Sequence, residues 1–361
     1  MKVLFFGVYD LNDSTAARTR IFLKGLKELG IEVIECNSEI RSFKRYVVLF
    51  KKYIKINKDY DIMFAAYPGA QLVMPIARIL AFFSRKKIVI DPIISLYDTM
   101  VCDRGILGGR GLKAAYYYFL DWFSGVASDL IIFDTNENIN YFSKTFHIKK
   151  EKFKRIFIGA DEDVMKPLNI PRGVENTSKK FTVHFHGYFI PLQGVEYIVK
   201  AAKILENENI IFNIIGKGQT YKEVFNLAEN LKLKNINFIG AAPFFELPKY
   251  ILGADVVLGI FGNTNKARRV IPHKVYDALA TGKPVITMKS AAIEELFSDG
   301  RDLILTNAAD ERDLAEKILM LKNNPELRKK IAENGYKLFK EKLNRKILTE
   351  ELAEAFKETI N

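Results

Sequence analysis

Apolar and polar positions follow two alternating patterns along the whole chain. Short apolar runs such as KVLFFGVY and IEVIEC have the length and composition of buried strands. Between them, STAARTRIFLKGLKELG carries apolar residues at helical spacing, with a polar start and a closing glycine. The order strand, helix, strand within residues 2–36 is typical of a parallel α/β sheet.

The same order restarts after a polar stretch at residues 167–180, PLNIPRGVENTSKK, whose prolines and glycine indicate a linker. Apolar runs at residues 181–189, 209–219 and 255–261 then predict further strands separated by helices. A chain of 361 residues exceeds one typical domain. We therefore predict two doubly wound α/β halves.

Composition narrows the class of protein. Two cysteines, Cys36 and Cys102, are too few for a disulfide framework, and four histidines without a Cys-x-x-Cys pair give no metal-ligand spacing. These counts favour a reduced, cytoplasmic, metal-free protein. The most apolar window, QLVMPIARILAFF, contains Pro75 and Arg78, so we expect no transmembrane helix. The apolar start meets Asp10 early and predicts a buried strand rather than a signal peptide.

The net charge of +12 is unevenly distributed, with 27 basic against 19 acidic residues in 1–172 and 28 against 24 in 173–361. Residues 41–58 hold seven cations and no acid. Apolar side chains recur among these cations at helical spacing, at Phe43, Val47, Phe50 and Ile54. This pattern predicts a basic amphipathic helix that contacts an anionic membrane, although a solvated surface helix explains it as well. Nucleic-acid binding is disfavoured, because the aromatic residues sit in apolar runs rather than among basic ones.

The strongest chemical pattern lies at residues 266–295, KARRVIPHKVYDALATGKPVITMKSAAIEE. A proline before the run HKVYDALA and a glycine after it mark a helix start and stop. The free N–H groups and dipole of a helix N-terminus suit phosphate. With Lys266, Arg268 and Arg269 upstream and Asp277 about one turn inside, the segment suits a sugar nucleotide whose ribose hydroxyls Asp277 would hold. An ordinary helix with a solvated basic edge also fits.

Five segments in order carry a family resemblance: GADEDVMKP, HGYFIPLQGVEYIVKAA, IIGKGQ, INFIGAAP and IPHKVYDALATGKPVI. With them the chain resembles the retaining glycosyltransferases of family 4, also called group 1, which have the GT-B fold of two Rossmann-like domains. The resemblance implies an N-terminal acceptor-side domain at 1–168 with 346–361 and a donor-binding domain at 174–345. It also implies that the C-terminal helix crosses back to the first domain.

The implied activity is transfer of a hexose-type sugar from a nucleotide sugar to a hydroxyl acceptor. The basic helix at 41–58 points to a lipid-linked or cell-surface glycan precursor as acceptor, in polysaccharide biosynthesis at the inner face of the cell membrane. The family's front-face retaining scheme needs no protein nucleophile, no metal and no cofactor. A nucleotide-sugar epimerase of the same fold and a non-catalytic nucleotide-sugar- or glycan-binding protein remain alternatives.

The family's donor-binding residues carry over to a set of positions in the second half. The resemblance places Gly187 in the phosphate turn, Gly216 and Gly218 where backbone approaches the nucleotide, and Asp277 in place of the ribose-binding glutamate. The remaining predicted donor-binding residues of the second half are Tyr188, Gln193, Lys217, Ala241, Arg268, His273 and Lys274. Ser14 is predicted from the first half, because it lies at the first strand-to-helix turn, where open α/β sheets bind ligands. A plain N-cap explains Ser14 equally well.

The chain departs from the family pattern in its charges. Tyr188 and Gln193 stand where the family has the cations that neutralise the diphosphate, and Arg269 stands where it has a glutamate. We therefore predict that the cluster at 266–274, with Lys266 and Arg269 as catalytic cations, stabilises the leaving diphosphate.

The histidine that the family places at a turn of the first domain is also missing. Asp91, Ser95 and Asp98 occupy that region. If the reaction inverts, a general base is needed, and Asp98 is the first candidate and Asp91 the second.

Overall fold

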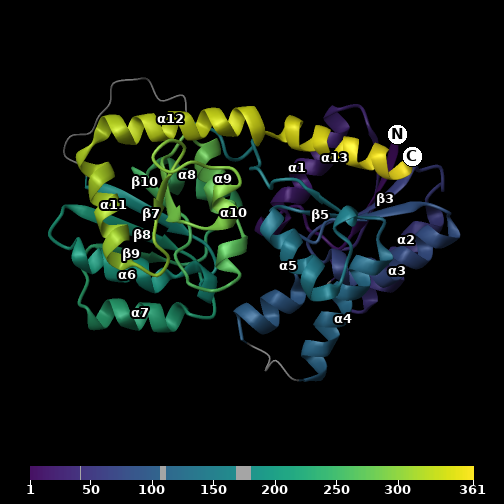
Figure 1. Ribbon diagram of the computed structural model, residues 1–361, viewed down its shortest axis with the longest axis horizontal. Coiled ribbons are helices and arrows are strands. Elements are labelled where there is room, and N and C mark those ends of the chain that lie inside the picture. Colours follow the sequence, from purple (N-terminus) through teal and green to yellow (C-terminus); the bar gives the residue numbers. More distant parts are fainter. Residues whose placement is uncertain (41, 106–110, 168–179) are drawn as a thin grey trace. The chain divides into compact units, whose positions relative to one another are not determined.

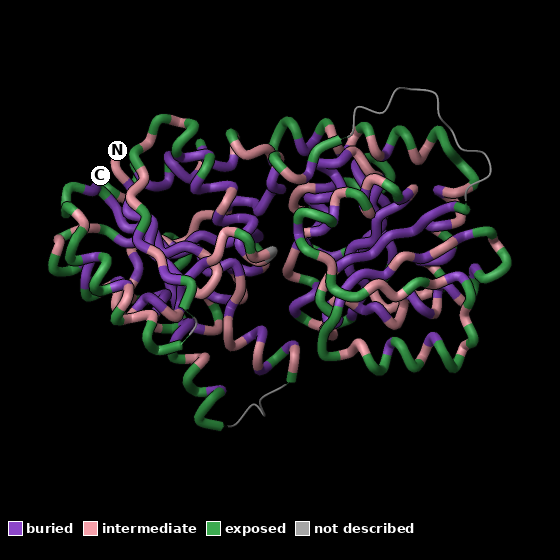
Figure 2. The backbone as a smooth tube through the Cα atoms, turned by 180° about the vertical axis from the view of Figure 1, so that it is seen from behind, coloured by how far each residue is buried: buried purple, intermediate pink, exposed green. Residues whose placement is uncertain are grey.

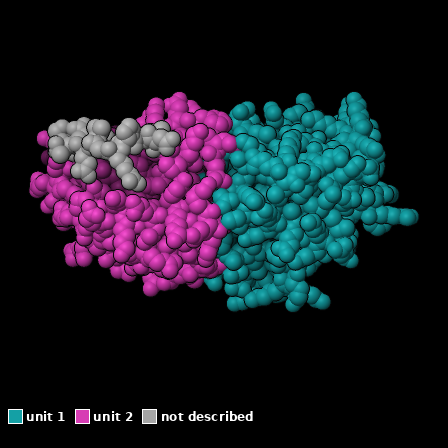
Figure 3. Space-filling view, turned by 90° about the horizontal axis from the view of Figure 1, so that it is seen from above, with its two compact units in different colours: residues 1–161, 344–361 teal, residues 162–343 magenta. Residues whose placement is uncertain are grey.

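The computed structural model describes residues 1–40, 42–105, 111–167 and 180–361. It contains two compact units, which Figure 3 shows in different colours. Unit 1 comprises Met1–Asp161 with Asn344–Asn361, and unit 2 comprises Glu162–Leu343. The boundaries predicted from the sequence were 168/174 and 345/346, and the predicted linker at 167–180 lies almost wholly outside the described residues.

Unit 1 is built on a parallel sheet in the order β2-β1-β3-β4-β5-β6. Its strands are β1 (Lys2–Gly7), β2 (Glu32–Asn37), β3 (Ile62–Ala65), β4 (Lys87–Ile90), β5 (Leu130–Phe133) and β6 (Phe153–Arg155). Most of these strands are continuous apolar runs, as expected where helices cover both faces of a sheet. Figure 2 shows strands buried in both units and exposed residues on the outer helices.

The helices of unit 1 are α1 (Ala17–Glu28), α2 (Lys44–Lys55), α3 (Ala70–Phe83), α4 (Leu112–Ala127), α5 (Asn136–Phe146) and α13 (Arg345–Ile360). α13 packs against α1 (Figure 1), so the C-terminal helix returns to the first unit as predicted. Gly25 lies at this contact, where an added Cβ would be 2.9 Å from Cβ of Thr349 and closer still to its hydroxyl.

Replacing Gly25 by valine should therefore lower the free energy of unfolding by about 2 kcal/mol, because the larger side chain over-packs the contact between α1 and α13. Urea denaturation followed by circular dichroism measures this difference. The control is Lys24→Val on the exposed face of the same helix, which should change stability by less than about 0.5 kcal/mol. A Gly25→Val protein as stable as the control would contradict the close packing.

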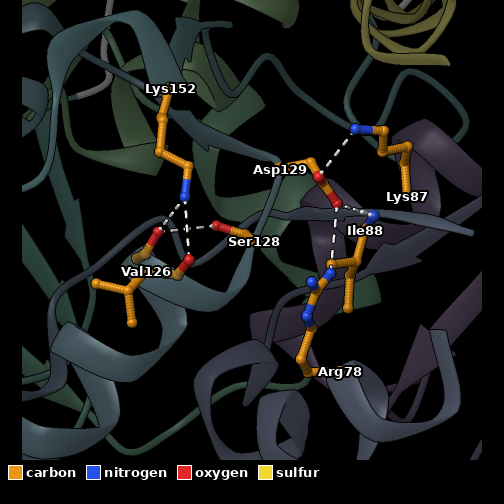
Figure 4. A network of polar contacts seen from close by, with 8 residues as sticks. Arg78, Lys87, Ile88, Val126, Ser128, Asp129 and Lys152 are labelled. Carbon is orange, nitrogen blue, oxygen red and sulfur yellow. Dashed lines mark hydrogen bonds and ion pairs between the residues drawn. The ribbon is translucent and has the colours of Figure 1, made fainter. Parts of the chain in front are cut away.

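The C-terminal ends of α3 and α4 are held by polar contacts (Figure 4). Lys152 Nζ donates to the carbonyls of Gly125 and Val126 at 3.0 and 3.1 Å, and so satisfies acceptors that the last turn of α4 leaves open. Asp129, just beyond α4, lies 3.7 Å from Nη1 of Arg78 on α3. These contacts fix the two helices to the sheet beneath them.

Unit 2 repeats the design with a parallel sheet in the order β12-β11-β10-β7-β8-β9. Its strands are β7 (Phe181–His186), β8 (Ile210–Ile215), β9 (Ile236–Ile239), β10 (Val256–Leu258), β11 (Val285–Met288) and β12 (Ile304–Thr306). Its helices are α6 (Val195–Ile204), α7 (Tyr221–Asn230), α8 (Leu247–Leu252), α9 (His273–Ala280), α10 (Ala291–Glu294), α11 (Glu311–Asn323) and α12 (Pro325–Lys342).

The strand order of unit 2 reverses between β7 and β10, the first and fourth strands of the unit. In open α/β sheets, ligands bind beyond the carboxyl ends of the strands at this reversal. A ligand site is therefore expected at the segments that follow β7 and β10. Among the described residues, no helix has the length and apolar character needed to cross a membrane.

Candidate donor-binding site

Two glycine turns lie side by side at the carboxyl edge of the unit 2 sheet. The N–H of Gly187, after β7, donates to the Ile215 carbonyl at 3.0 Å, and the N–H of Phe189 donates to the Lys217 carbonyl at 2.9 Å. A Cβ at Gly216 would collide with the Gly187 carbonyl oxygen, and one at Gly218 would lie 2.5 Å from the Phe189 carbonyl oxygen. Both glycines also have positive φ, +150° and +153°. Glycine is therefore required at 216 and 218 for the two turns to touch.

Helix α9 brings Asp277 to the strand that precedes the first turn. Its Oδ2 lies 3.5 Å from Nδ1 of His273, one turn earlier, and 3.8 Å from Nε2 of His186 at the end of β7. Asp277 is buried. Burial alone would raise the pKa of its carboxyl group, but the imidazoles of His273 and His186 outweigh burial and hold the pKa at about 2. Asp277 is thus a carboxylate throughout the neutral pH range.

Asp277 and His273 each have one unsatisfied polar atom. Within the described residues, Oδ1 of Asp277 and Nε2 of His273 are buried and have no hydrogen-bond partner. Buried polar atoms are nearly always paired, and an unpaired one costs roughly 1–3 kcal/mol. An ionised oxygen beside an imidazole nitrogen can bind a donor group such as a hydroxyl of a vicinal diol.

Two histidines of β7 complete the cluster, and the sequence analysis missed both as site residues. His184 and His186 are two residues apart, so they lie on one face of the strand. Nε2 of His184 lies 3.0 Å from Nδ1 of His186, and burial lowers the pKa of both imidazoles. The signal was present in the sequence, because FTVHFHGYF places two of the four histidines in the strand that enters the glycine turn.

Lys274 lies directly beneath the first glycine turn. Its ammonium group donates to Oε1 of Gln193 and sits 3.6 Å from the centre of the Phe185 ring. A Cβ added at Gly187 would come within 2.9 Å of Nζ. Lys274 is buried, which moves the pKa of its amine well below the usual value. Among the described residues, Nζ contacts Oε1 of Gln193 and the Phe185 ring. An anion bound at the turn would favour the ammonium form that burial disfavours.

The other predicted cations precede α9, on and next to the short 3-10 turn Ala267–Arg269. Lys266 is buried, whereas Arg268 is exposed and donates to Oδ1 of Asn263 at 2.6 Å. Arg269 is half-buried. Their roles at the diphosphate, catalytic for Lys266 and Arg269, stay predictions.

The remaining predicted residues of unit 2 flank the two turns. Tyr188 and Lys217 are exposed, and Gln193 is half-buried against Lys274. Ala241 is exposed in the loop that follows β9. The structure thus joins Gly187, Gly216, Gly218, Gln193, His273, Lys274 and Asp277 in one set of contacts.

The predicted bases lie in unit 1, after β4. Asp91 is buried, and Oδ2 accepts from Nε of Arg18 at 2.8 Å. Arg18 is itself fixed by the Ile156 and Phe157 carbonyls. Burial raises the pKa of Asp91, and the Arg18 guanidinium opposes that rise. This buried ion pair connects α1 to the end of β4. Because Arg18 occupies the Asp91 carboxylate, the pair opposes the predicted role of Asp91 as a base.

Asp98 begins a π-helical turn, Asp98–Asp103, and is also buried. Its N–H donates to Oγ of Ser95 at 3.0 Å. Asp121 of α4 holds this turn by accepting from Oγ of Ser95 at 2.7 Å and from the Tyr97 N–H at 2.8 Å. Burial raises the pKa of Asp121 to about 6. The role of Asp98 as a base stays a prediction.

Ser14 lies in the 3-10 turn Ser14–Ala16 that follows β1, and its side chain is outside the described part of the structure. For metals, the described residues contain no group of three or more histidine, cysteine, aspartate or glutamate side chains placed to bind an ion.

Comparison with known proteins finds a family match over most of unit 2. Residues 168–338 match the family model described as glycosyl transferases group 1. A protein of Methanocaldococcus jannaschii described as uncharacterized glycosyltransferase MJ1178 is 30% identical over 151 residues, which cover 42% of this chain and 41% of that protein. An uncharacterized 41.2 kDa protein in the cps region of Klebsiella pneumoniae is 24% identical over 281 residues, or 77% of this chain and 73% of that protein.

The fold is also that of a solved structure. Alr3699/HepE of Anabaena, crystallised with UDP-glucose, superimposes with a TM-score of 0.73 over 99% of this chain and 100% of that one, at 17% identity. At this identity the likeness concerns the fold alone. Residues 168–338 therefore match the group 1 glycosyl transferases, and the chain has the GT-B fold. Both agree with the resemblance predicted from its sequence, whose retaining type stays a prediction.

Proposed function

We propose that the chain transfers a sugar from a nucleoside diphosphate sugar to a hydroxyl acceptor, with the donor bound at the carboxyl edge of unit 2. The observation that carries this proposal is a pair of unsatisfied polar atoms, Oδ1 of the ionised Asp277 and Nε2 of His273. They belong to two side chains whose other polar atoms, Oδ2 and Nδ1, lie 3.5 Å apart. A ribose diol supplies the two hydroxyls that such a pair can bind. Asp277 also occupies the position of the glutamate that holds ribose in the family.

The diphosphate would lie over the Gly187 turn. Lys274 supplies a cation there from below, and the glycines allow the backbone to approach the phosphates without a Cβ in the way. Negative charge grows on the leaving diphosphate as the bond to the sugar breaks, so a fixed cation at this place stabilises the transition state. Lys266 and Arg269 are proposed to add to the same effect. Because these residues supply the positive charge, we propose that the reaction needs no metal and no cofactor.

For the acceptor, we propose a lipid-linked or cell-surface glycan precursor, met at the inner face of the cell membrane through the basic segment 41–58. The exposed basic face of α2 and the cps-region relative of Klebsiella pneumoniae support this acceptor class. A retaining outcome is proposed from the resemblance, and the configuration of the product tests it. If the product is inverted, Asp98→Asn should abolish turnover, since a general base is then required.

Binding of UDP-glucose and of other nucleotide sugars can be tested by thermal unfolding. A ligand at about 100 times its Kd stabilises the folded state by about 2.7 kcal/mol, which for a domain of this size raises Tm by roughly 5–10 °C. We expect at least one nucleotide sugar to give such a shift, and the parent sugar without nucleotide to give none. The absence of a shift across uridine, guanosine, adenosine and thymidine diphosphate sugars would contradict the proposal.

Product analysis separates the alternative functions. A transferase incubated with its donor and no acceptor releases nucleoside diphosphate slowly, by transfer to water. An epimerase instead converts the donor into an isomeric sugar, and a non-catalytic binding protein leaves it unchanged. Free nucleoside diphosphate in the absence of acceptor is the expected result.

A further inference from the structure

We infer that the outer faces of α2, α3 and α4 form one surface that docks on an anionic lipid bilayer. This inference deepens the proposed function, since it states with which residues the enzyme would reach a membrane-borne acceptor. The sequence indicated only the segment 41–58, whereas the structure adds two further helices. We call the three outer faces together the lipid-facing surface, and list its apolar side chains helix by helix below.

Helix α2 carries a second apolar stripe, on the face that points away from the core. A surface helix normally turns its apolar stripe to the core. Here Leu49 and Tyr53 alone are buried on α2, while four apolar side chains on the helix or at its N-cap point outward, with Phe43 77% exposed. The four are Phe43, Val47, Phe50 and Ile54. Their exposure has a cost in water that contact with lipid would remove.

A second exposed stripe runs along α4. Its residues recur every three or four positions, so they share one face of the helix, and Leu112 at its start is 92% exposed. They are Leu112, Tyr116, Phe119, Trp122 and Val126. Tyrosine and tryptophan combine an apolar ring with one polar group and are enriched at the interface between lipid and water. Close to the end of α3, Ile79, Phe82 and Phe83 are exposed as well.

Specific contacts place the three helices next to one another in unit 1 (Figure 1). The Tyr46 hydroxyl of α2 donates to the Leu72 carbonyl of α3 at 2.7 Å, and the Tyr53 hydroxyl donates to the Leu80 carbonyl at 3.2 Å. α2 and α3 therefore run side by side in the same direction. On the other flank of α3, Nε2 of Gln71 lies 3.3 Å from Oδ1 of Asp121 on α4.

The charges around these stripes identify a lipid surface as the occupant. α2 carries five cations and no acidic residue, α3 and its C-cap Ser84 are followed by three more cations, and Lys113 is the second residue of α4. The first two groups are Lys44, Arg45, Lys51, Lys52 and Lys55, and then Arg85, Lys86 and Lys87. Basic residues around an apolar, aromatic surface bind anionic headgroups while the apolar side chains enter the acyl boundary. A second copy of the chain seated on the same face would instead bring like charges together.

Vesicle flotation tests the inference with the whole chain. We expect binding to phosphatidylcholine vesicles that contain about 30% phosphatidylglycerol, and at least tenfold weaker binding to phosphatidylcholine alone. Raising NaCl from about 0.1 to about 1 M shortens the Debye length from about 10 to about 3 Å, and should weaken binding similarly. Equal binding to both kinds of vesicle, or none to either, would overturn the inference.

Paired variants locate the surface. The double variants Phe119→Ser/Trp122→Ser on α4 and Phe43→Ser/Phe50→Ser on α2 should each lower the affinity for anionic vesicles at least tenfold. The matched control is Phe245→Ser, which removes a similarly exposed phenylalanine, 54% exposed, from unit 2, and should leave vesicle binding unchanged. Wild-type binding by the α4 variant would exclude α4 from the surface. Self-association in light scattering that the same variants abolish would assign the surface to a second copy instead.

The experiments distinguish failure of the proposed donor site from failure of the proposed lipid-facing surface. All these residues lie outside the contacts of the donor site, so each variant should keep the thermal shift given by the nucleotide sugar. Vesicle binding without any nucleotide-sugar shift would refute the donor site and leave the lipid-facing surface standing. A normal thermal shift with the nucleotide sugar but no vesicle binding would refute the lipid-facing surface and leave the donor site standing.

Discussion

Asp277→Asn should weaken binding of the nucleotide sugar about 100-fold, because an ionised acceptor for a ribose hydroxyl becomes a neutral amide, and a hydrogen bond to a charged group contributes about 1.5–3 kcal/mol. Isothermal titration with wild-type and variant protein measures the change. The pKa of Asp277 of about 2 adds a second expectation. Between pH 8 and pH 5 the carboxylate does not titrate, so its contribution to binding should stay constant over that range.

Two controls accompany this variant. Asp277→Glu keeps a carboxylate at this position, one methylene further from the backbone, and should retain most of the affinity. Asp277→Asn should remain folded at neutral pH, which the thermal unfolding curve of the free protein shows. Because the folded-state pKa lies below that of a free aspartate, the stabilising effect of the charge is present above pH 4 or so and is lost as pH falls toward 2. Unchanged binding by a folded Asp277→Asn protein would exclude Asp277 from the ribose site.

Lys274→Met should lower kcat about 100- to 1,000-fold, because the variant removes the cation that lies closest beneath the Gly187 turn, while methionine keeps a similar length against the Phe185 ring. Loss of one preorganised charge stabiliser has an effect of this size in other enzymes. Steady-state assays with the identified donor measure the change. Lys203→Met, at an exposed ion pair on α6, is the matched control and should keep wild-type turnover.

Lys274 also predicts a pH dependence with a definite sign. Burial lowers the pKa of its amine in the free protein, and a diphosphate beside it favours the ammonium form and raises that pKa in the complex. The complex therefore binds more protons than the free protein between the two pKa values, so affinity for the nucleotide sugar should increase as pH falls, by at most about tenfold per pH unit. In Lys274→Met this dependence should disappear. A variant with the same slope as the wild type would assign the titration to another group.

Much of the fold could be predicted from the sequence, because the pattern of a buried strand or an amphipathic helix is contained in a short run of consecutive residues. The strand KVLFFG, the helix at 273–280 between its proline and glycine, and the basic helix around 44–55 all lie where their patterns place them. The glycines at 216 and 218 were likewise visible in IIGKGQ. A Cβ at position 216 would collide with the Gly187 carbonyl, which makes glycine necessary there. These two residues are far apart in the chain, so only the fold reveals this requirement.

Side-chain environments in the site could not be predicted in the same way. From the sequence, Lys274 is one more cation of a basic cluster, whereas the structure buries it between Gln193, Phe185 and Gly187. Asp91 was a candidate base by its position after a strand, but its carboxylate is paired with Arg18 of α1. These contacting residues lie on elements that are distant in the sequence, so no local sequence pattern reveals them.

The sequence by itself determined the two α/β halves, the order of their elements, the glycine turns and the helix that carries Asp277, since apolar periodicity and turn residues act over a few positions. Only the tertiary structure decided which side chains surround Asp277, because strand order sets His186 of β7 beside α9, about ninety residues further along the chain. It also decided which face of α2 is covered. Packing buries Leu49 and Tyr53 and leaves Phe43, Val47, Phe50 and Ile54 exposed, a choice that helical spacing alone cannot make because both faces of the helix are apolar.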